Sequence, residues 1–282
     1  CVGLIPRKFI AKAPRTGDMV ISAEGLKKEY DGRVLFHDLD LSVGRGERIG
    51  IIGPNGSGKS TLAKCLIGEM AADAGKVRLG SNVSVGHFSQ LHEGLDLDLT
   101  VWEYLQGVIL SIDGGRRASE QQARDLAGAF LFSGNDQDKV LRVLSGGERS
   151  RVILAGLVAG GHNLLILDEP TNHFDIPSAE RLEQALHPET GFDGTMLLIS
   201  HDRALLDACV DRIISLDGSG ETRLVTGNYT AWRELREREA AAQAQARIAA
   251  KAQASPRKEV ANNKPPKKSA SSTGALSKMS MS

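Results

Sequence analysis

Residues 53–60 read Gly-Pro-Asn-Gly-Ser-Gly-Lys-Ser, which fills every fixed position of the spacing G-x-x-x-x-G-K-[ST]. Residues 47–52 predict a strand that leads into this loop, and residues 58–67 predict a helix that follows it. The three glycines allow the backbone to approach a ligand closely and to adopt positive φ angles. Because the predicted helix also directs its N-terminal dipole at the loop, this stretch predicts a cradle for closely spaced phosphate charge. A chance glycine-rich turn is the alternative.

A second stretch, Asn163-Leu-Leu-Ile-Leu-Asp-Glu169, ends in two adjacent carboxylates. Its four apolar residues are typical of a strand buried in a parallel sheet. Open α/β sheets bind ligands at the carboxyl ends of their strands, so Asp168 and Glu169 are expected beside the glycine loop. There Lys59 would contact the β- and γ-phosphates of ATP, while Ser60 and Asp168 would bind Mg²⁺. Glu169 would accept the proton of the attacking water or orient that water, and an ordinary acidic strand end is the alternative.

Composition limits the class of protein. The chain has 282 residues with 35 Lys and Arg against 35 Asp and Glu, so its formal net charge is zero. This length is sufficient for one sizeable core with appendages or for two small domains. No apolar run approaches the roughly 20 residues needed to span a bilayer, and no signal peptide opens the sequence. The scattered cysteines, Cys1, Cys65 and Cys209, suggest neither a disulfide framework nor a zinc site, which predicts a reducing, cytoplasmic location.

Strand and helix patterns alternate through most of the chain, which predicts a largely parallel sheet with helices on both faces. Besides the stretches above, strands are predicted at residues 19–23, 39–43, 195–199 and 213–216, and another is predicted to begin at Val83 and end near Gln90. Helices are predicted to begin near Pro177 and Asp202. Residues 95–150 interrupt the alternation with capping-box sequences at Thr100 and Ser119, and they predict a helical insertion.

The two ends of the chain differ from this middle part. Residues 1–18 are basic and punctuated by Pro and Gly, as expected for a linker remnant, and we expect a fragment of a longer protein. From Tyr229 the pattern turns helical, and residues 233–282 carry eleven Lys and Arg against four Glu. Beyond Ser255 the composition predicts disorder. This basic tail is interpreted either as an electrostatic arm for nucleic-acid phosphates or as a solvated linker.

Leu144-Ser-Gly-Gly-Glu148 is a third motif, and it precedes an apolar-rich helix. Ser145 and Glu148 have the spacing of a capping box, and a helix N-terminus with two bare glycines can receive an anion. As an ordinary helix start the motif would be unremarkable. Taken in order with the glycine loop and the acidic strand end, it resembles the ATP-binding cassette (ABC) ATPases. The loop is similar to that family's Walker A motif, residues 144–148 to its signature and residues 163–169 to Walker B.

The resemblance covers roughly residues 19–232 and implies an α/β fold. The implied architecture is a P-loop NTPase (ABC ATPase) core with an antiparallel β subdomain and an inserted helical subdomain. A helical and then disordered basic tail, residues 233–282, would follow it. The implied cofactors are ATP and Mg²⁺.

The same resemblance implies three further site residues. Tyr30 would stack on adenine, Gln90 would link Mg²⁺ and water to the helical insertion, and His201 would contact the γ-phosphate. A surface tyrosine, a loop glutamine and a structural histidine are the alternatives. The implied catalytic residues are Glu169, His201, Gln90 and Lys59, and the implied metal ligands are Ser60, Gln90 and Asp168. The implied nucleotide contacts are Tyr30, Gly53, Pro54, Asn55, Gly56, Ser57, Gly58, Lys59, Ser60, Thr61, Ser145, Gly146, Gly147 and Glu148.

The resemblance also implies a partner. In this family the signature of one cassette closes over the ATP bound to another. Ser145, Gly146 and Gly147 would therefore complete a site on a second ABC cassette, either a missing N-terminal half or a second copy of this chain. ATP would join the two cassettes, and hydrolysis would release them.

Residues 169–175, Glu-Pro-Thr-Asn-His-Phe-Asp, are similar to the E-P-T-N-H-L-D stretch of subfamily F, with Phe174 in place of Leu. Residues 200–206 and 227–232 also resemble the second cassette of that subfamily, whose members act on ribosomes. Residues 216–232 look closest to its Uup-like branch. The resemblance implies action on the ribosome in translation, and an ABC transporter subunit or a DNA-associated ATPase are the alternatives.

Overall fold

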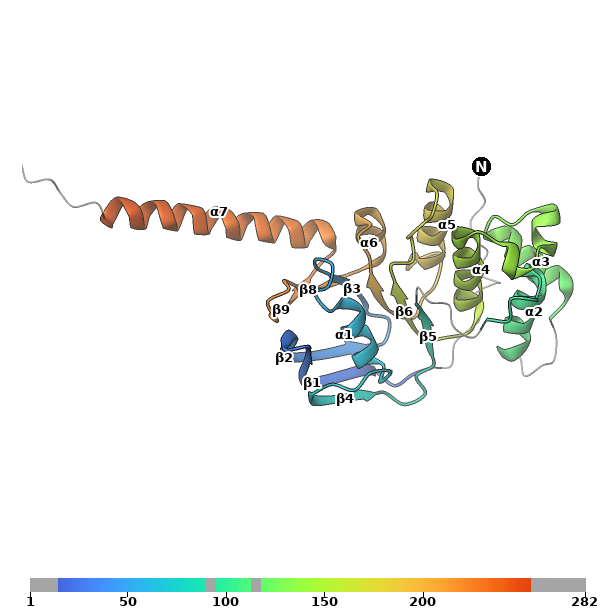
Figure 1. Ribbon diagram of the computed structural model, residues 1–282, viewed down its shortest axis with the longest axis horizontal. Coiled ribbons are helices and arrows are strands. Elements are labelled where there is room, and N and C mark those ends of the chain that lie inside the picture. Colours follow the sequence, from blue (N-terminus) through green and yellow to red (C-terminus); the bar gives the residue numbers. More distant parts are fainter. Residues whose placement is uncertain (1–14, 90–94, 113–117, 255–282) are drawn as a thin grey trace, which may run out of the picture. The chain divides into compact units, whose positions relative to one another are not determined.

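The computed structural model describes residues 15–89, 95–112 and 118–254, with side chains to residue 248. The chain divides into two units, Cys1–Arg236 and Glu237–Ser282. The first unit contains both sheets and the helices that pack on them (Figure 1). Gln90 and the tail beyond residue 254, for which sequence predictions were made, lie outside the described residues.

A six-stranded sheet forms the centre of the first unit. Its strand order is β5 (Val85–Phe88), β6 (Leu164–Asp168), β7 (Thr195–Ile199), β3 (Arg48–Ile52), β8 (Arg212–Leu216) and β9 (Thr222–Thr226). All neighbours in this sheet pair in parallel except β8 and β9, which are antiparallel. The predicted parallel sheet is therefore confirmed, and β9 is an antiparallel edge strand that the sequence did not predict.

A second sheet has three antiparallel strands in the order β2 (Arg33–Gly44), β1 (Met19–Tyr30) and β4 (Ala74–Leu79). This is the antiparallel β subdomain that the family resemblance implied. β1 and β2 extend well beyond residues 19–23 and 39–43 because they form one long hairpin. Asp31 (φ 50) and Gly32 (φ 77) form its two-residue turn, and Asp-Gly favours the positive φ angles that such turns require.

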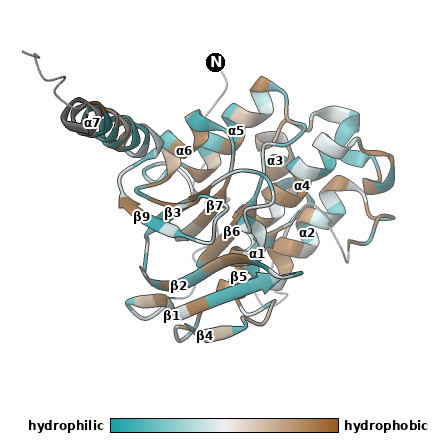
Figure 2. Ribbon diagram, turned by 60° about the vertical axis from the view of Figure 1, so that its left-hand side comes forward, coloured by the Kyte–Doolittle hydropathy of each residue, from teal (hydrophilic) through white to brown (hydrophobic). Residues whose placement is uncertain are grey.

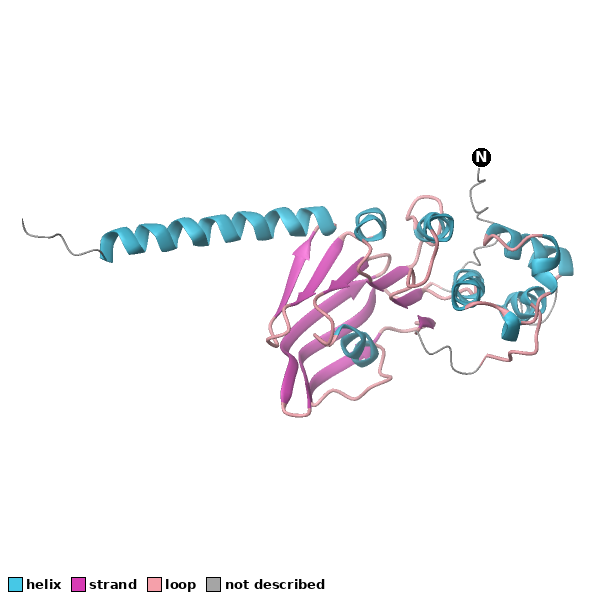
Figure 3. Ribbon diagram, turned by 45° about the horizontal axis from the view of Figure 1, so that its top comes forward, coloured by secondary structure: helices cyan, strands magenta, loops and turns pink. Residues whose placement is uncertain are grey.

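Helices cover both faces of the central sheet (Figures 1 and 3). α1 (Lys59–Leu66) lies on the face toward the three-stranded sheet, and α4 (Gly146–Ala159), α5 (Ile176–Leu186) and α6 (Arg203–Cys209) cover the other face. α2 (Val101–Ile112), α3 (Glu120–Ala129) and two 3₁₀ helices, η2 (Gly134–Asp138) and η3 (Leu141–Val143), fall in the region predicted as a helical insertion. α7 (Tyr229–Ala254) begins in the first unit and continues into the second.

The central strands supply side chains alternately to two hydrophobic cores. Figure 2 colours much of the central sheet as hydrophobic. In β6, Leu164 and Ile166 join the core with α1, whereas Leu165 and Leu167 join the core beneath α4 to α6. This alternation follows from the two-residue period of a strand. Burial on both faces explains why the strand reads as an uninterrupted apolar run.

The predicted capping boxes at Thr100 and Ser145 are present, and the predicted helix start at Ser119 forms a third. The Thr100 hydroxyl accepts a hydrogen bond from the Glu103 amide at 3.3 Å, and the Glu103 carboxylate accepts one from the Thr100 amide at 2.8 Å. Ser119 with Gln122 and Ser145 with Glu148 make the same reciprocal bonds at the starts of α3 and α4. Among the described helices, none combines the length and apolarity needed to cross a bilayer.

Candidate active site

The glycine loop connects β3 to α1 and takes the backbone conformations that its sequence predicts. Gly53 (φ 156), Gly56 (φ 74) and Gly58 (φ 99) all have positive φ angles, and Gly58 is the N-cap of α1. A Cβ atom at Gly53 would overlap the carbonyl oxygen of Leu216, and one at Gly58 would lie 3.0 Å from Leu35 Cβ. At Gly56 a Cβ would meet nothing within 4 Å, so this glycine faces open space. The loop therefore exposes bare backbone at the start of a helix.

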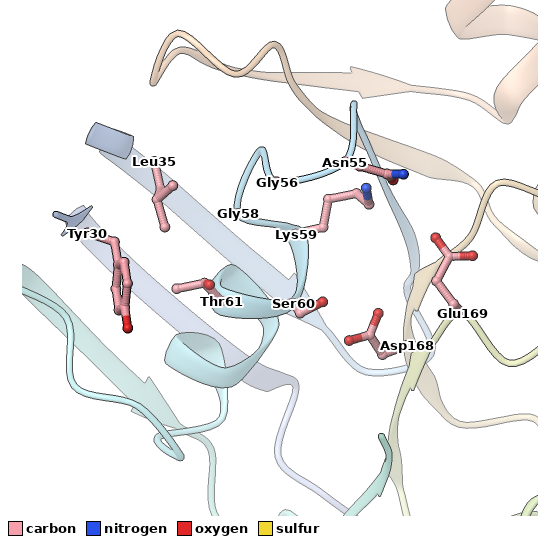
Figure 4. A pocket seen from close by; sticks show the side chains of 10 residues that line it. All are labelled: Tyr30, Leu35, Asn55, Gly56, Gly58, Lys59, Ser60, Thr61, Asp168 and Glu169. Atoms are coloured by element: carbon pink, nitrogen blue, oxygen red, sulfur yellow. The ribbon is translucent and has the colours of Figure 1, made fainter. Parts of the chain in front are cut away.

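A pocket of about 470 Å³ lies at this loop (Figure 4). It is lined by Tyr30, Leu35, Asn55, Gly56, Gly58, Lys59, Ser60, Thr61, Asp168 and Glu169. Nine of these ten residues were predicted site residues, although they come from separate parts of the sequence. Tyr30 and Leu35 form the wall contributed by the β1–β2 hairpin, and the two carboxylates stand on the opposite side, at the end of β6 (Figure 4).

The ammonium group of Lys59 lies over the loop that carries it. Its Nζ donates hydrogen bonds to the carbonyl oxygens of Gly53 at 3.0 Å and Pro54 at 3.2 Å. The same atom is 3.5 Å from His201 Nε2. Positive charge is thus held at the mouth of a glycine-lined loop, where a polyphosphate requires it.

Asp168 and Glu169 extend from the carboxyl end of β6 toward the start of α1. The side chains of Asp168 and Ser60 point toward one another in Figure 4. The Glu169 backbone has a φ of 49°, a left-handed conformation that few non-glycine residues adopt, and its amide donates to the Ile199 carbonyl oxygen at 2.9 Å. Such backbone outliers concentrate at functional sites.

Glu169 has one unsatisfied oxygen. Its Oε2 accepts a hydrogen bond from the His201 amide at 3.2 Å, whereas its buried Oε1 has no hydrogen-bond partner among the described residues. His201 Nε2 approaches Oε1 to 3.3 Å without the alignment of a hydrogen bond. Native proteins rarely leave a buried carboxylate oxygen unpaired, so this atom is available to a ligand or a water molecule.

His201 follows β7 and brings together three parts of the site. Its Nε2 lies 3.2 Å from Asn55 Oδ1, 3.3 Å from Glu169 Oε1 and 3.5 Å from Lys59 Nζ. The side chain is 57% exposed, and the next residue, Asp202, caps α6 by accepting hydrogen bonds from two of its amides. The imidazole is therefore held beside the glycine loop and remains accessible to a ligand.

The donor set at the pocket fits a Mg²⁺ ion. Ser60 supplies a hydroxyl and Asp168 a carboxylate, which are the hard oxygen ligands that Mg²⁺ prefers. No cluster of three or more His, Cys, Asp or Glu side chains suited to a metal occurs in the described part of the chain. Mg²⁺ needs no such cage, because it keeps several waters and binds through one or two protein groups together with substrate phosphates.

The signature residues do not line this pocket. Ser145 and Gly146 are exposed at the start of α4, and none of the residues 145–148 is among those lining the pocket. A Cβ at Gly147 would lie 2.7 Å from the His173 carbonyl oxygen, so bare backbone is required where the loop after Glu169 packs on α4. Hydrogen bonds from Ser145 hold the pKa of the Glu148 carboxyl below its usual value.

Sequence reasoning missed Leu35. This residue lines the pocket with Tyr30, and a Cβ at Gly58 of the glycine loop would lie 3.0 Å from its Cβ. The Asp31-Gly32 turn was the available signal, because a two-residue hairpin fixes which residues of the returning strand lie near Tyr30. Ser57 differs from its neighbours in the loop: it is buried, and its hydroxyl has no partner among the described residues.

Known proteins match this chain as follows. The family model described as ABC transporter matches residues 36–172. The energy-dependent translational throttle protein EttA of Escherichia coli (strain K12) is 40% identical over 230 residues, which cover 82% of this chain and 40% of EttA. The ATP-binding protein Uup of Caulobacter vibrioides is 36% identical over 225 residues, covering 78% of this chain and 36% of Uup. The chain spans about two fifths of the length of these relatives.

Solved structures share the fold. A dimeric post-hydrolysis ATP-binding cassette bound to ADP and Pi superposes with a TM-score of 0.60 at 23% identity, covering 73% of this chain and 98% of that chain. An ADP-bound cassette of an ABC transporter superposes with a TM-score of 0.57 at 22% identity, covering 74% and 91%. With the family match and the curated relatives, these findings show that residues 36–172 carry an ABC-type ATP-binding cassette domain, in a chain that is similar over most of its length to EttA and Uup.

Proposed function

We propose that this cassette binds MgATP, closes on a second ABC cassette and hydrolyses ATP to reopen, and that it acts in this way on the ribosome during translation. The observation that carries the hydrolytic part is the Glu169 carboxylate. It stands across one pocket from Lys59 and Ser60, with a buried oxygen that has no hydrogen-bond partner among the described residues. A free, oriented acceptor beside a phosphate cradle is what activation of a water requires.

Catalysis of phosphoryl transfer requires mainly that the protein position the reacting groups and neutralise the phosphate charge. Lys59 and the amides at the start of α1 bind the phosphates, and Tyr30 and Leu35 hold the base against the hairpin. Mg²⁺, when held by Ser60 and Asp168, with Gln90 as a further proposed ligand, neutralises phosphate charge. Glu169 takes the proton of the attacking water at its Oε1, and His201 holds the end of the phosphate chain.

The second cassette is part of the proposal. Ser145 and Gly146 are exposed on the first turn of α4 and lie apart from the pocket of their own chain, which supports a role in a partner's site. The solved cassette bound to ADP and Pi is dimeric, which also supports it. Ser145, Gly146, Gly147 and the capped N-terminus at Glu148 would then receive the terminal phosphate of the partner's nucleotide.

The proposed action on the ribosome, and with it the proposed cytoplasmic location, rests on the curated relatives. EttA is described as an energy-dependent translational throttle protein, and it is 40% identical to this chain. The basic residues after Arg233 support contact with rRNA, because each Lys or Arg near a phosphate releases a counterion.

Sucrose-gradient sedimentation tests this proposal. The Glu169→Gln variant is prepared in the longest natural form of the protein, with the matching change in any second cassette, and mixed with ribosomes. Co-migration with ribosomes in ATP but not in ADP is expected, because blocked hydrolysis retains the closed state. The double change Glu169→Gln with Lys59→Ala is the control and should remain at the top of the gradient.

Absence of ribosome association in both nucleotides at low salt would contradict the ribosomal part of the proposal. Preferential binding to branched DNA in competition would favour a DNA-associated ATPase instead. Copurification with a membrane protein would favour a transporter subunit. An unchanged rate of ATP hydrolysis in Glu169→Gln would contradict the role of Glu169 itself.

A further inference from the structure

The turn between β8 and β9, residues 217–221, lies next to two parts of the nucleotide pocket. One is the β1–β2 hairpin, which carries Tyr30 and Leu35, and the other is the glycine loop, which leads to Lys59 and Ser60. The turn is distant in sequence from both parts and does not itself line the pocket.

On the side of the hairpin, the turn accepts two hydrogen bonds from β2. Arg33 Nη2 donates to the Gly218 carbonyl oxygen at 3.1 Å, and the His37 amide donates to the Gly220 carbonyl oxygen at 3.2 Å. A Cβ added at Gly220 would lie 3.1 Å from Val34 Cγ1. The strand register pairs Arg33 with Tyr30 across the hairpin. The hydrogen bond from Arg33 to Gly218 therefore restrains the end of β2 beside Tyr30.

On the side of the phosphates, the chain entering the turn lies against the start of the glycine loop. The Leu216 carbonyl oxygen occupies the space that a side chain at Gly53 would need. A Cβ at Gly218 would be in ordinary contact with the Pro54 ring at 3.7 Å. The turn and the strand end that leads into it therefore lie next to the glycine loop as well as the hairpin.

The turn has a defined internal shape. Asp217 Oδ1 accepts hydrogen bonds from the Ser219 amide and the Ser219 hydroxyl, both at 2.7 Å, and these bonds lower the pKa of the Asp217 carboxyl. Gly218 (φ 84) and Gly220 (φ 101) adopt conformations that side chains disfavour. The turn can thus act as a spacer of fixed dimensions.

We propose that Arg33 is a positioning residue for the nucleoside part of the nucleotide: through the turn of residues 217–221 it fixes Tyr30 at a set distance from the phosphate loop. This inference rests on the proposed stacking of adenine on Tyr30. It makes a specific prediction about affinity. Loss of the Arg33 hydrogen bond weakens the binding of ligands that carry a base and leaves the binding of phosphate-only ligands unchanged.

Isothermal titration calorimetry of the full chain tests this prediction by measuring its affinity for MgATP and for magnesium tripolyphosphate. Arg33→Ala should weaken MgATP about three- to tenfold, as expected for one lost hydrogen bond, and leave tripolyphosphate affinity unchanged. Arg45→Ala is the matched control, because Arg45 is also on the surface near β2 and its ion pair with Asp18 is long, at 4.0 Å. It should change neither affinity.

A glycine pair provides a second test that acts on the turn itself. Gly220→Ala and Gly46→Ala both place a side chain at a positive φ angle, 101° and 78°, and so carry similar backbone strain. At Gly220 the added methyl group presses on Val34, whereas at Gly46 it meets nothing within 4 Å. Only Gly220→Ala should lower MgATP affinity relative to tripolyphosphate affinity.

Equal weakening of both ligands by Arg33→Ala, or weakening of neither, overturns the positioning role while the ATPase assignment stands. Equal affinity of the unaltered chain for both ligands also overturns it, because the contact between Tyr30 and the base would then contribute nothing to affinity. An unaltered chain that binds neither ligand contradicts the proposed nucleotide site, and the inference is rejected with it.

Discussion

Glu169 combines a left-handed backbone with a buried carboxylate oxygen that has no hydrogen-bond partner among the described residues. Replacing it with Gln keeps the size of the side chain and removes its ability to take a proton. We expect ATP hydrolysis to fall by about 10²- to 10⁴-fold, because this is the usual contribution of a general base. ATP affinity should change little, since the phosphates are proposed to bind Lys59 and the amides at the start of α1. Phosphate release and nucleotide titration measure the two effects.

Glu180→Gln is the control for that experiment. Glu180 is an exposed residue of α5. Its replacement by Gln alters charge and shape in the same way as Glu169→Gln, but outside the pocket. It should leave both hydrolysis and binding unchanged. Equal losses in the two variants would mean that net charge, and not the position of Glu169, determines the rate.

The two adjacent glycines of the signature have different structural constraints. A methyl group at Gly147 would lie 2.7 Å from the His173 carbonyl oxygen, and one at Gly146 would meet nothing within 4 Å. Gly147→Ala should therefore lower the free energy of unfolding by about 1–3 kcal/mol, the usual range for overpacking. Gly146→Ala should leave it unchanged or raise it slightly, because Ala favours helices. Urea titration of both variants decides between these outcomes, and equal effects would refute the assigned contact.

At the residue scale, most of the site could be predicted because its chemistry restricts residue type and spacing. Gly53 to Thr61 form one continuous motif, and Asp168 and Glu169 end an apolar strand. Leu35 could not be found in this way, since an apolar residue in a strand has many possible roles. The contact between Lys59 and His201 also depends on how β3 and β7 pair, which no local pattern reveals.

Among the elements, α4 shows how a cap links local stability to pH. Ser145 and Glu148 exchange hydrogen bonds at its N-terminus, and these bonds lower the pKa of Glu148 below its ordinary 4.5. A carboxyl with a lowered folded pKa stabilises the fold fully above its unfolded pKa. That contribution is lost as the pH falls through the lowered value.

Glu148→Gln should therefore reduce the free energy of unfolding by about 0.5–1 kcal/mol at pH 7, the scale of a carboxylate at a helix N-terminus. The difference between the variant and the unaltered chain should shrink once the pH falls below about 4.5. Urea titrations at pH 7, 5 and 3.5 measure it. A difference that stays constant over this range would show that the charge of Glu148 does not stabilise α4.

Strands were predicted correctly where burial gives the sequence a clear apolar pattern, and they were missed where it does not. β6 and β7 are buried on both faces and were predicted as strands. β4 and β9 are edge strands, mostly exposed, so their sequences lack an apolar alternation. The length of β1 was underestimated because a bulge near Gly25, whose amide donates to Asp40 Oδ1 at 2.7 Å, interrupts its period.

At the scale of the whole molecule, two large apolar side chains are strongly exposed beside the signature. Ile176 is 77% exposed at the start of α5, and Val143 is 65% exposed just before Ser145. If a partner cassette closes over Ser145, these side chains become buried on association. Ile176→Glu in a Glu169→Gln background should therefore weaken MgATP-dependent association at least about tenfold, because it would bury a charge. Light scattering with a titration of protein concentration measures this effect.

Leu224→Glu is the control for this prediction. Leu224 is an exposed apolar residue of β9, on a strand remote in sequence from the signature. It should leave association unchanged, and both variants should bind ATP as the unaltered chain does. Equal association of the Ile176 and Leu224 variants would show that the partner does not cover the start of α5.

Neighbouring side chains of a strand point to opposite faces of its sheet, so Asp168 and Glu169 would diverge if β6 simply continued. Asp168 has the parity of Ile166, which faces α1, and Glu169 has the parity of Leu167, which faces away from it. The two carboxylates meet in one pocket because the chain leaves the extended conformation at Glu169. The placement of the acidic pair therefore depends on the number of residues in β6, because insertion or deletion of one residue would turn each carboxylate toward the opposite face of the sheet.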